Sequence, residues 1–228
     1  MKFGSKLEVK RFEDRILKHE ARPVETGKIL FYGHSLFTRC SPITKCTDNP
    51  MLEEEVRMKD GSGAIVNHGF GTSSADDLLY YYPRMVRPYK PRALFLATAS
   101  NDLGLGYYPH EIMDIEARLI DWFKADFPGA PVYCFSAIPC LLRKNETGII
   151  VRAYDDYNSL LEEYCKSHDC TYISKAHMPF LYRHEEDIGD WTKMSLLNFV
   201  GDQTHFNSDG YRRFFDWLRD FLDQEGLL

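Results

Sequence analysis

Residues 93–97 read Ala-Leu-Phe-Leu-Ala, with no polar side chain, and Thr98-Ala99-Ser100-Asn101 follow at once. A short, continuous apolar run is typical of a strand that is buried on both faces, as in a parallel sheet covered by helices. Four other β-rich runs alternate with segments of helical periodicity. The strands are predicted at 28–32, 64–67, 93–98, 132–136 and 171–173, and the helices at 74–86, 109–127 and 151–168. This order predicts an α/β fold: a three-layer α/β/α sandwich around a five-stranded parallel sheet.

Both ends of the chain add helices to this core. Residues 208–222 place Tyr211, Phe214 and Leu218 at helical spacing, which predicts a final amphipathic helix. Residues 1–22 are predicted to be an N-terminal helical extension, with the helix itself at 11–20. At 228 residues, with 44% hydrophobic and 27% charged side chains, the chain is predicted to form one domain over 1–228.

The charge balance narrows the range of partners. A net charge of -6 provides no basic surface for nucleic acid or an anionic membrane. The N-terminal segment has no apolar signal-peptide core, and no apolar run approaches the length of a membrane span, so we expect a cytoplasmic protein. The sequence leaves a homo-oligomer open.

Cysteine spacing gives little reason to expect a bridge or a metal site. A reducing cytosol favours free thiols for all six cysteines: Cys40, Cys46, Cys134, Cys140, Cys165 and Cys170. Cys165, His168, Cys170 and His177 permit a metal interpretation, but their spacing matches no zinc template. We therefore predict neither a metal nor a cofactor.

Three short stretches carry candidate chemistry at the predicted carboxyl edge of the sheet. Ser35 follows the first strand, Asn101 follows the third, and Asp202 precedes His205 by three residues before the last helix. Each has an ordinary explanation as a cap, a turn residue or a loop hydrogen bond. Ligands bind beyond the carboxyl ends of strands in such sheets, so their joint occurrence favours one catalytic site.

The order and context of these residues resemble the SGNH (GDSL-like) hydrolases, a family of bacterial acylhydrolases and esterases with a flavodoxin-like fold. Residues 66–74, Val-Asn-His-Gly-Phe-Gly-Thr-Ser-Ser, look like the second sequence block of that family, and the resemblance spans about 11–221. It implies that Ser35 is the nucleophile, that His205 is the general base and then the acid, and that Asp202 orients His205.

The same resemblance implies an oxyanion hole. Its donors would be the backbone amide of Ser35, the amide of Gly71 or Thr72, and the side chain of Asn101. Asp102, beside Asn101, is interpreted as a local cap.

Three positions depart from the family pattern. His34 stands where the family usually has Asp, and we interpret it as altered loop bonding or a substrate contact rather than a second base. Thr72 aligns with an oxyanion glycine, and a β-branched residue is not expected to adopt the positive φ that glycine tolerates. Ala99 replaces a usual glycine, and its methyl group narrows the space beside the pocket.

The expected activity is hydrolysis of a carboxylic ester, with a short acyl group such as acetyl, on a small or carbohydrate substrate. Tyr107 and Tyr108, which follow Asn101, are the candidates for further substrate contacts. Two alternatives stay open: a non-catalytic ligand-binding protein on the same scaffold, and an acyltransferase that uses the same residues.

Overall fold

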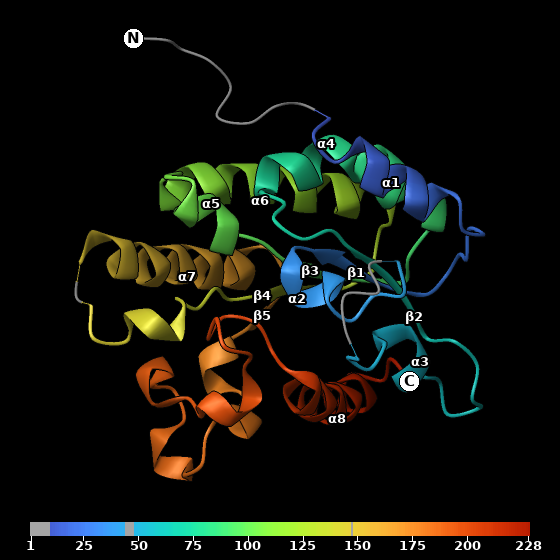
Figure 1. Ribbon diagram of the computed structural model, residues 1–228. Coiled ribbons are helices and arrows are strands. Elements are labelled where there is room, and N and C mark those ends of the chain that lie inside the picture. The colour runs from blue at the N-terminus through green and yellow to red at the C-terminus, as the bar shows by residue number, and fades with distance from the viewer. Residues whose placement is uncertain (1–9, 44–47, 147) are drawn as a thin grey trace, which may run out of the picture.

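The computed structural model describes residues 10–43, 48–146 and 148–228. Its middle layer is an all-parallel sheet of five strands in the order β2-β1-β3-β4-β5 (Figure 1). The strands are β1 (Ile29–Gly33), β2 (Ile65–Gly69), β3 (Ala93–Ala97), β4 (Val132–Phe135) and β5 (Thr171–Ile173). The predicted α/β/α sandwich is confirmed, because every strand overlaps its expected run, with β1 ending one residue and β2 two residues later, and the strand order is that of flavodoxin-like sheets.

Helices cover both faces of the sheet (Figure 1). They are α1 (Glu13–Glu20), α2 (Ser35–Thr38), α3 (Leu52–Glu55), α4 (Ala75–Met85), α5 (Ser100–Gly104), α6 (Pro109–Asp126), α7 (Ile149–Ser167) and α8 (Ser208–Gln224). One core joins α1, α4, α6 and α7 to one face of the sheet, and a second joins α2, α3 and α8 to the other. The short helices α3 and α5 were not predicted, because one turn shows no periodicity.

Aromatic side chains link neighbouring strands on the α8 face. The rings of Phe31 and Phe95 stack with centroids 4.6 Å apart, and the rings of Phe95 and Tyr133 stack at 4.4 Å. Phe221 of α8 meets both Phe95 and Tyr133 edge to face. These contacts fix the central strands relative to the last helix, which directly follows the His205 loop.

Two glycines allow close approach at the carboxyl edge. A Cβ atom on Gly33 would lie 2.4 Å from the carbonyl oxygen of Ala97, and one on Gly69 would lie 2.4 Å from the amide nitrogen of Thr38. Any larger residue would push β1 away from β3, or α2 away from β2. The ends of the three strands that bear the candidate site are therefore held close together.

The structure also describes most of the cysteines, and it can be searched for membrane-spanning helices and metal-binding groups. The five described cysteines, Cys40, Cys134, Cys140, Cys165 and Cys170, are free thiols, whereas Cys46 and residues 1–9 of the predicted extension lie outside the described residues. Within the described ranges, no helix has the length and apolar character of a membrane span. The same ranges contain no group of three or more His, Cys, Asp or Glu side chains placed to hold a metal ion.

Two buried histidines connect α1 to the sheet. His19 of α1 is 1% exposed and meets the ring of His68 on β2 edge to face, with centroids 4.9 Å apart. Nδ1 of His68 pairs with the carbonyl oxygen of Met85 at 2.6 Å. Burial lowers the pKa of His19 to about 2 and that of His68 to about 4. Both rings are therefore neutral in the folded protein at pH 5–7.

Mild acid should destabilise the fold through this pair. The unfolded chain protonates both rings near pH 6.5 while the folded chain does not, so their contribution is complete above that pH and declines below it. Between pH 7 and pH 5.5 we expect a loss of about 1 kcal/mol per ring. Burial raises the pKa of Asp102 and Glu116 to about 7, which stabilises the fold as the pH falls over the same interval, so the loss is measured as the difference between wild type and a His19 variant in urea unfolding at the two pH values. Replacing His19 by Leu should reduce the pH dependence of the free energy of unfolding, and replacing the exposed His184 by Gln should reduce it less. Equal effects would contradict the assignment of this pH dependence to the buried pair.

Candidate active site

Ser35 occupies the first position of α2, directly after β1. His34 caps this helix, since its Nδ1 accepts a hydrogen bond from the amide of Leu36 at 3.3 Å. That amide fixes the tautomer of His34, with the proton on Nε2. The hydroxyl of Ser35 is thus presented at a strand-to-helix corner on the carboxyl edge of the sheet.

Asp202 and His205 lie in a tight loop between Phe199 and Phe206, which form an antiparallel bridge. Oδ1 of Asp202 accepts hydrogen bonds from the amides of Thr204 and His205, at 2.9 and 3.0 Å. Its Oδ2 lies 2.7 Å from Nδ1 of His205. Partial burial opposes ionisation, but the hydrogen bonds from His205 and Thr204 outweigh it and lower the pKa of Asp202 to about 2. The carboxylate is therefore charged at neutral pH.

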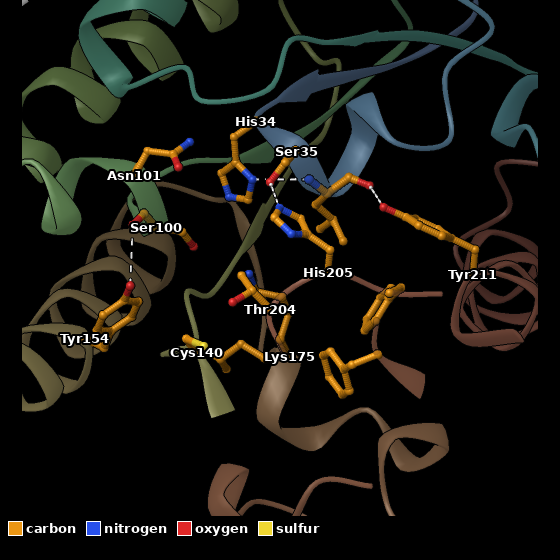
Figure 2. A pocket seen from close by; sticks show the side chains of 14 residues that line it. His34, Ser35, Ser100, Asn101, Cys140, Tyr154, Lys175, Thr204, His205 and Tyr211 are labelled. Carbon is orange, nitrogen blue, oxygen red and sulfur yellow. Dashed lines mark hydrogen bonds between the residues drawn. The ribbon is translucent and has the colours of Figure 1, made fainter. Parts of the chain in front are cut away.

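The structure brings Ser35, His205 and Asp202 together in one chain of hydrogen bonds. Nε2 of His205 lies 2.9 Å from Oγ of Ser35 (Figure 2). Because Asp202 is ionised and accepts the Nδ1 proton, Nε2 is free to accept the proton of the Ser35 hydroxyl. This is the geometry of an activated serine nucleophile.

Backbone amides near Ser35 provide candidate oxyanion donors. In the described part of the chain, the amides of Ser35, Gly71 and Thr72 make no hydrogen bond. A Cβ atom on Gly71 would lie 3.8 Å from Cβ of Ser35, so this loop passes directly beside the serine. Arginines of α1 and the segment before it bind the carbonyl oxygens of the same loop: Arg15 that of Gly71 at 2.6 Å, and Arg11 that of Thr72 at 3.0 Å.

The residues after β3 fasten α5 to this loop. The side-chain amide of Asn101 donates to the carbonyl oxygen of Ser73 at 2.8 Å, which leaves its second N–H for the pocket that Asn101 lines with Ser35. Asp102 is not the local cap that we predicted. Its Oδ1 accepts from the amide of Ala75 at 2.7 Å and so caps the distant helix α4.

Two departures from the family pattern retain a glycine-like backbone. Thr72 has φ 65° and Ala99 has φ 72°. The expectation that threonine would avoid positive φ was wrong. Arg11 and Arg15 hold the carbonyls on one side of Thr72, and Asn101 and Asp102 hold the segment after it, so the surroundings impose the conformation. The loop keeps its path at a cost in strain.

Two cavities flank the Ser35–His205 pair. One, of about 150 Å³, has polar groups from His34, Asn101 and Lys175 beside apolar walls from Ile138 and Phe206 (Figure 2). The other, of about 380 Å³, passes the Gly71–Thr72 loop and includes Arg15, Lys18 and Arg39. An ester bound across the serine would have one part in each cavity.

The predicted substrate contacts have separate outcomes. His34 lines the smaller cavity, and burial lowers its pKa to about 3, so its ring is neutral. The structure does not bring Tyr107 or Tyr108 to either cavity. The hydroxyl of Tyr107 donates to Asp76 at 2.6 Å, and Tyr108 is 65% exposed, with its ring stacked on His110 at the start of α6. Helix α5 turns the chain away from the site before Tyr107.

Sequence reasoning missed several residues at the site. Lys175 follows β5, and the rule that ligands bind beyond strand ends could have identified it. Tyr154 of α7 also lines the smaller cavity, and its hydroxyl lies 3.4 Å from the carbonyl oxygen of Ser100. Arg39 lies 3.6 Å from Oδ2 of Asp202. No local pattern marks Tyr154 or Arg39, because their placement depends on tertiary packing.

The model of the GDSL-like Lipase/Acylhydrolase family matches residues 31–213. The chain belongs to this family. The match contains all three members of the hydrogen-bonded chain at the site, together with the Gly71–Thr72 loop and Asn101. A search of curated proteins finds no match.

Several solved structures share the fold at low sequence identity. A GDSL-like lipase from Bacteroides thetaiotaomicron superimposes with a TM-score of 0.70 at 13% identity, over 96% of this chain and 100% of that one. A variant of an acetyl-xylooligosaccharide esterase from Geobacillus Stearmophilus gives 0.63 at 18% identity, over 89% and 95%. An alpha/beta hydrolase from the metagenome of Lake Arreo gives 0.63 at 15%, over 90% and 98%.

Replacing Thr72 by Gly should stabilise the protein. A non-glycine residue in the left-handed region costs about 1–2 kcal/mol, while glycine costs about 0.5–1 kcal/mol in chain entropy. We expect a net gain of about 1 kcal/mol in the free energy of unfolding, measured by urea denaturation. Thr26, which is exposed and has no positive φ, provides the matched control: Thr26→Gly should destabilise. If Thr72→Gly loses stability as the control does, the positive φ of Thr72 does not strain the backbone.

Proposed function

We propose that this member of the family hydrolyses a carboxylic ester through an acyl-enzyme on Ser35. The observation that carries the proposal is the 2.9 Å contact between Oγ of Ser35 and Nε2 of His205, with Asp202 ionised on the other side of the ring. The low pKa of Asp202 favours the tautomer in which Nε2 accepts a proton, which is the state that a general base requires.

The reaction follows from these positions. Oγ of Ser35 attacks the ester carbonyl while Nε2 of His205 takes its proton, and the charge that develops on the carbonyl oxygen is met by unpaired amides at Ser35 and the Gly71–Thr72 loop. His205 then returns the proton to the leaving alcohol. Water enters, gives its proton to His205 and cleaves the acyl-serine, which frees the acid and restores the hydroxyl of Ser35.

The dimensions of the site favour a short acyl group. A cavity of about 150 Å³ accommodates a group of roughly six heavy atoms, the size of benzene. The acetyl-xylooligosaccharide esterase among the fold relatives is compatible with a small acyl group. We therefore propose a short-chain ester of a small or carbohydrate alcohol as the substrate.

Hydrolysis of 4-nitrophenyl acetate tests the proposal. Removing the hydroxyl in Ser35→Ala should lower kcat/KM at least about 10³-fold, because the nucleophile is lost. Release of 4-nitrophenolate is followed at 405 nm, and circular dichroism confirms that the variant is folded. Equal rates in wild type and Ser35→Ala would refute the assignment.

A fluorophosphonate separates an enzyme from a binding protein on the same scaffold. Only an activated serine reacts, so we expect one modification, at Ser35, found by peptide mass spectrometry. Asp202→Asn should label about 10²–10⁴-fold more slowly, because the His205 tautomer is no longer fixed. Ser167→Ala, a change on the exposed end of α7, should label like wild type. Absence of labelling in folded wild-type protein would favour the non-catalytic alternative.

A further inference from the structure

Lys175 is a buried charged residue that the proposed reaction does not use. It lies two residues after β5, and its backbone amide donates to Oγ of Ser136 at 2.7 Å, which fixes the start of this turn. The residue is only 6% exposed, and it lines the smaller cavity together with Ser35 and His205. Figure 2 shows Lys175 with Cys140 on the side of His205 away from Ser35 in that view.

The ammonium group of Lys175 has no partner. Within the part of the chain that the structure describes, it makes no hydrogen bond and no ion pair, and no carboxylate lines the cavity. Burial lowers its pKa to about 8, so most molecules still carry the charge at neutral pH. An unpaired buried charge costs several kcal/mol. A residue of this kind is consistent with a ligand that supplies the missing negative charge.

His34 adds a neutral imidazole ring to the same cavity. Its Nδ1 is occupied by the amide of Leu36, so Nε2 carries the proton, and that buried nitrogen makes no hydrogen bond of normal geometry, although it interacts with the backbone carbonyl of Thr98. The ring is 5% exposed. The cavity thus combines one cation without a partner and a neutral imidazole with apolar walls, and this combination fits a small anion on a short hydrocarbon stem.

We propose that the acyl part of the substrate ends in a carboxylate, which binds Lys175 in this cavity. The substrate would be a half-ester of a short dicarboxylic acid, of the size of succinate. The inference rests on the proposed ester hydrolysis and specifies its acyl group. The larger cavity, on the other side of Ser35, receives the alcohol, since the leaving group and the incoming water need room to exchange. Its arginines are already engaged, Arg15 with Gly71 and Arg39 with Asp202, and its Lys18 is exposed, so that water screens this charge as it does not screen the buried Lys175.

Two esters of equal acyl shape test the preference. Mono-(4-nitrophenyl) succinate ends in a carboxylate, whereas 4-nitrophenyl 4-methylpentanoate carries two methyl groups in place of its oxygens. Wild type should favour succinate in kcat/KM after the spontaneous rate is subtracted. Lys175→Met should reduce the succinate-to-methylpentanoate ratio about 10–100-fold, the range expected for one charge-assisted hydrogen bond. Lys144→Met, which removes an exposed lysine, should leave the ratio unchanged.

The outcomes separate this inference from the proposed function. Ser35-dependent turnover of both esters with a ratio that Lys175→Met does not alter would overturn the inference and leave ester hydrolysis intact. A third ester, 4-acetoxybenzoate, carries its carboxylate on the alcohol. If Lys175→Met slows cleavage of this ester and not of the succinate ester, the carboxylate that binds Lys175 belongs to the alcohol, and the assignment to the acyl part is wrong.

Binding provides a readout that needs no turnover. Succinate should bind Ser35→Ala in calorimetry, and the double variant Ser35→Ala/Lys175→Met should bind it at least about tenfold more weakly. The binding test remains valid if neither ester is cleaved. Absence of cleavage would contradict the proposed ester hydrolysis but not the anion site. Equal affinity in the two proteins, or no binding to Ser35→Ala, would contradict the anion site.

Discussion

The close approach of strands at the carboxyl edge of the sheet is the constraint on which the site depends. Gly33 pairs with Gly69 on one side and with Ala97 on the other, so β1, β2 and β3 end at the same level. The next residues on each strand therefore open into one space. Because a Cβ atom on Gly33 would collide with the carbonyl oxygen of Ala97, the absence of a side chain there permits Ser35 and the residues after β3 to face the same cavity.

Most of the fold follows from local patterns, and so does part of the site. Short continuous apolar runs such as 93–97, between segments of helical periodicity, indicate buried strands, and the Asp202–His205 pair forms within one loop, where three residues suffice for the hydrogen bonds. The contact of His205 with Ser35 joins positions 170 residues apart and depends on α8 packing against the sheet. Sequence could propose that contact only through the positions of these residues after strand ends and the resemblance to a known family.

What sequence could not predict has a common physical cause, which is tertiary contact overriding local preference. Thr72 adopts positive φ because Arg11 and Arg15 donate to the carbonyl oxygens of Thr72 and Gly71, while Asp102 accepts from the amide of Ala75, and these side chains lie on other elements. Tyr107 follows Asn101 closely in sequence but turns to Asp76 instead, because α5 reverses the chain. A residue that follows a strand end closely in sequence is therefore less certain to line the site when a helical turn lies between the strand and that residue.

The electrostatics of the two sides of Ser35 differ in a way that bears on substrate choice. On one side, Asp202 is ionised, accepts from His205 and lies near Arg39, so these charges are paired, and Lys18 is exposed to solvent. On the other, Lys175 has neither a hydrogen bond nor an ion pair among the described residues, and the ring of His34 beside it is neutral. A low-dielectric cavity strengthens attraction to an anion and also raises the cost of leaving a cation there alone. A bound carboxylate would remove that cost when the ester reaches Ser35. Binding of the terminal carboxylate to Lys175 and positioning of the ester carbonyl at Ser35 would therefore occur together.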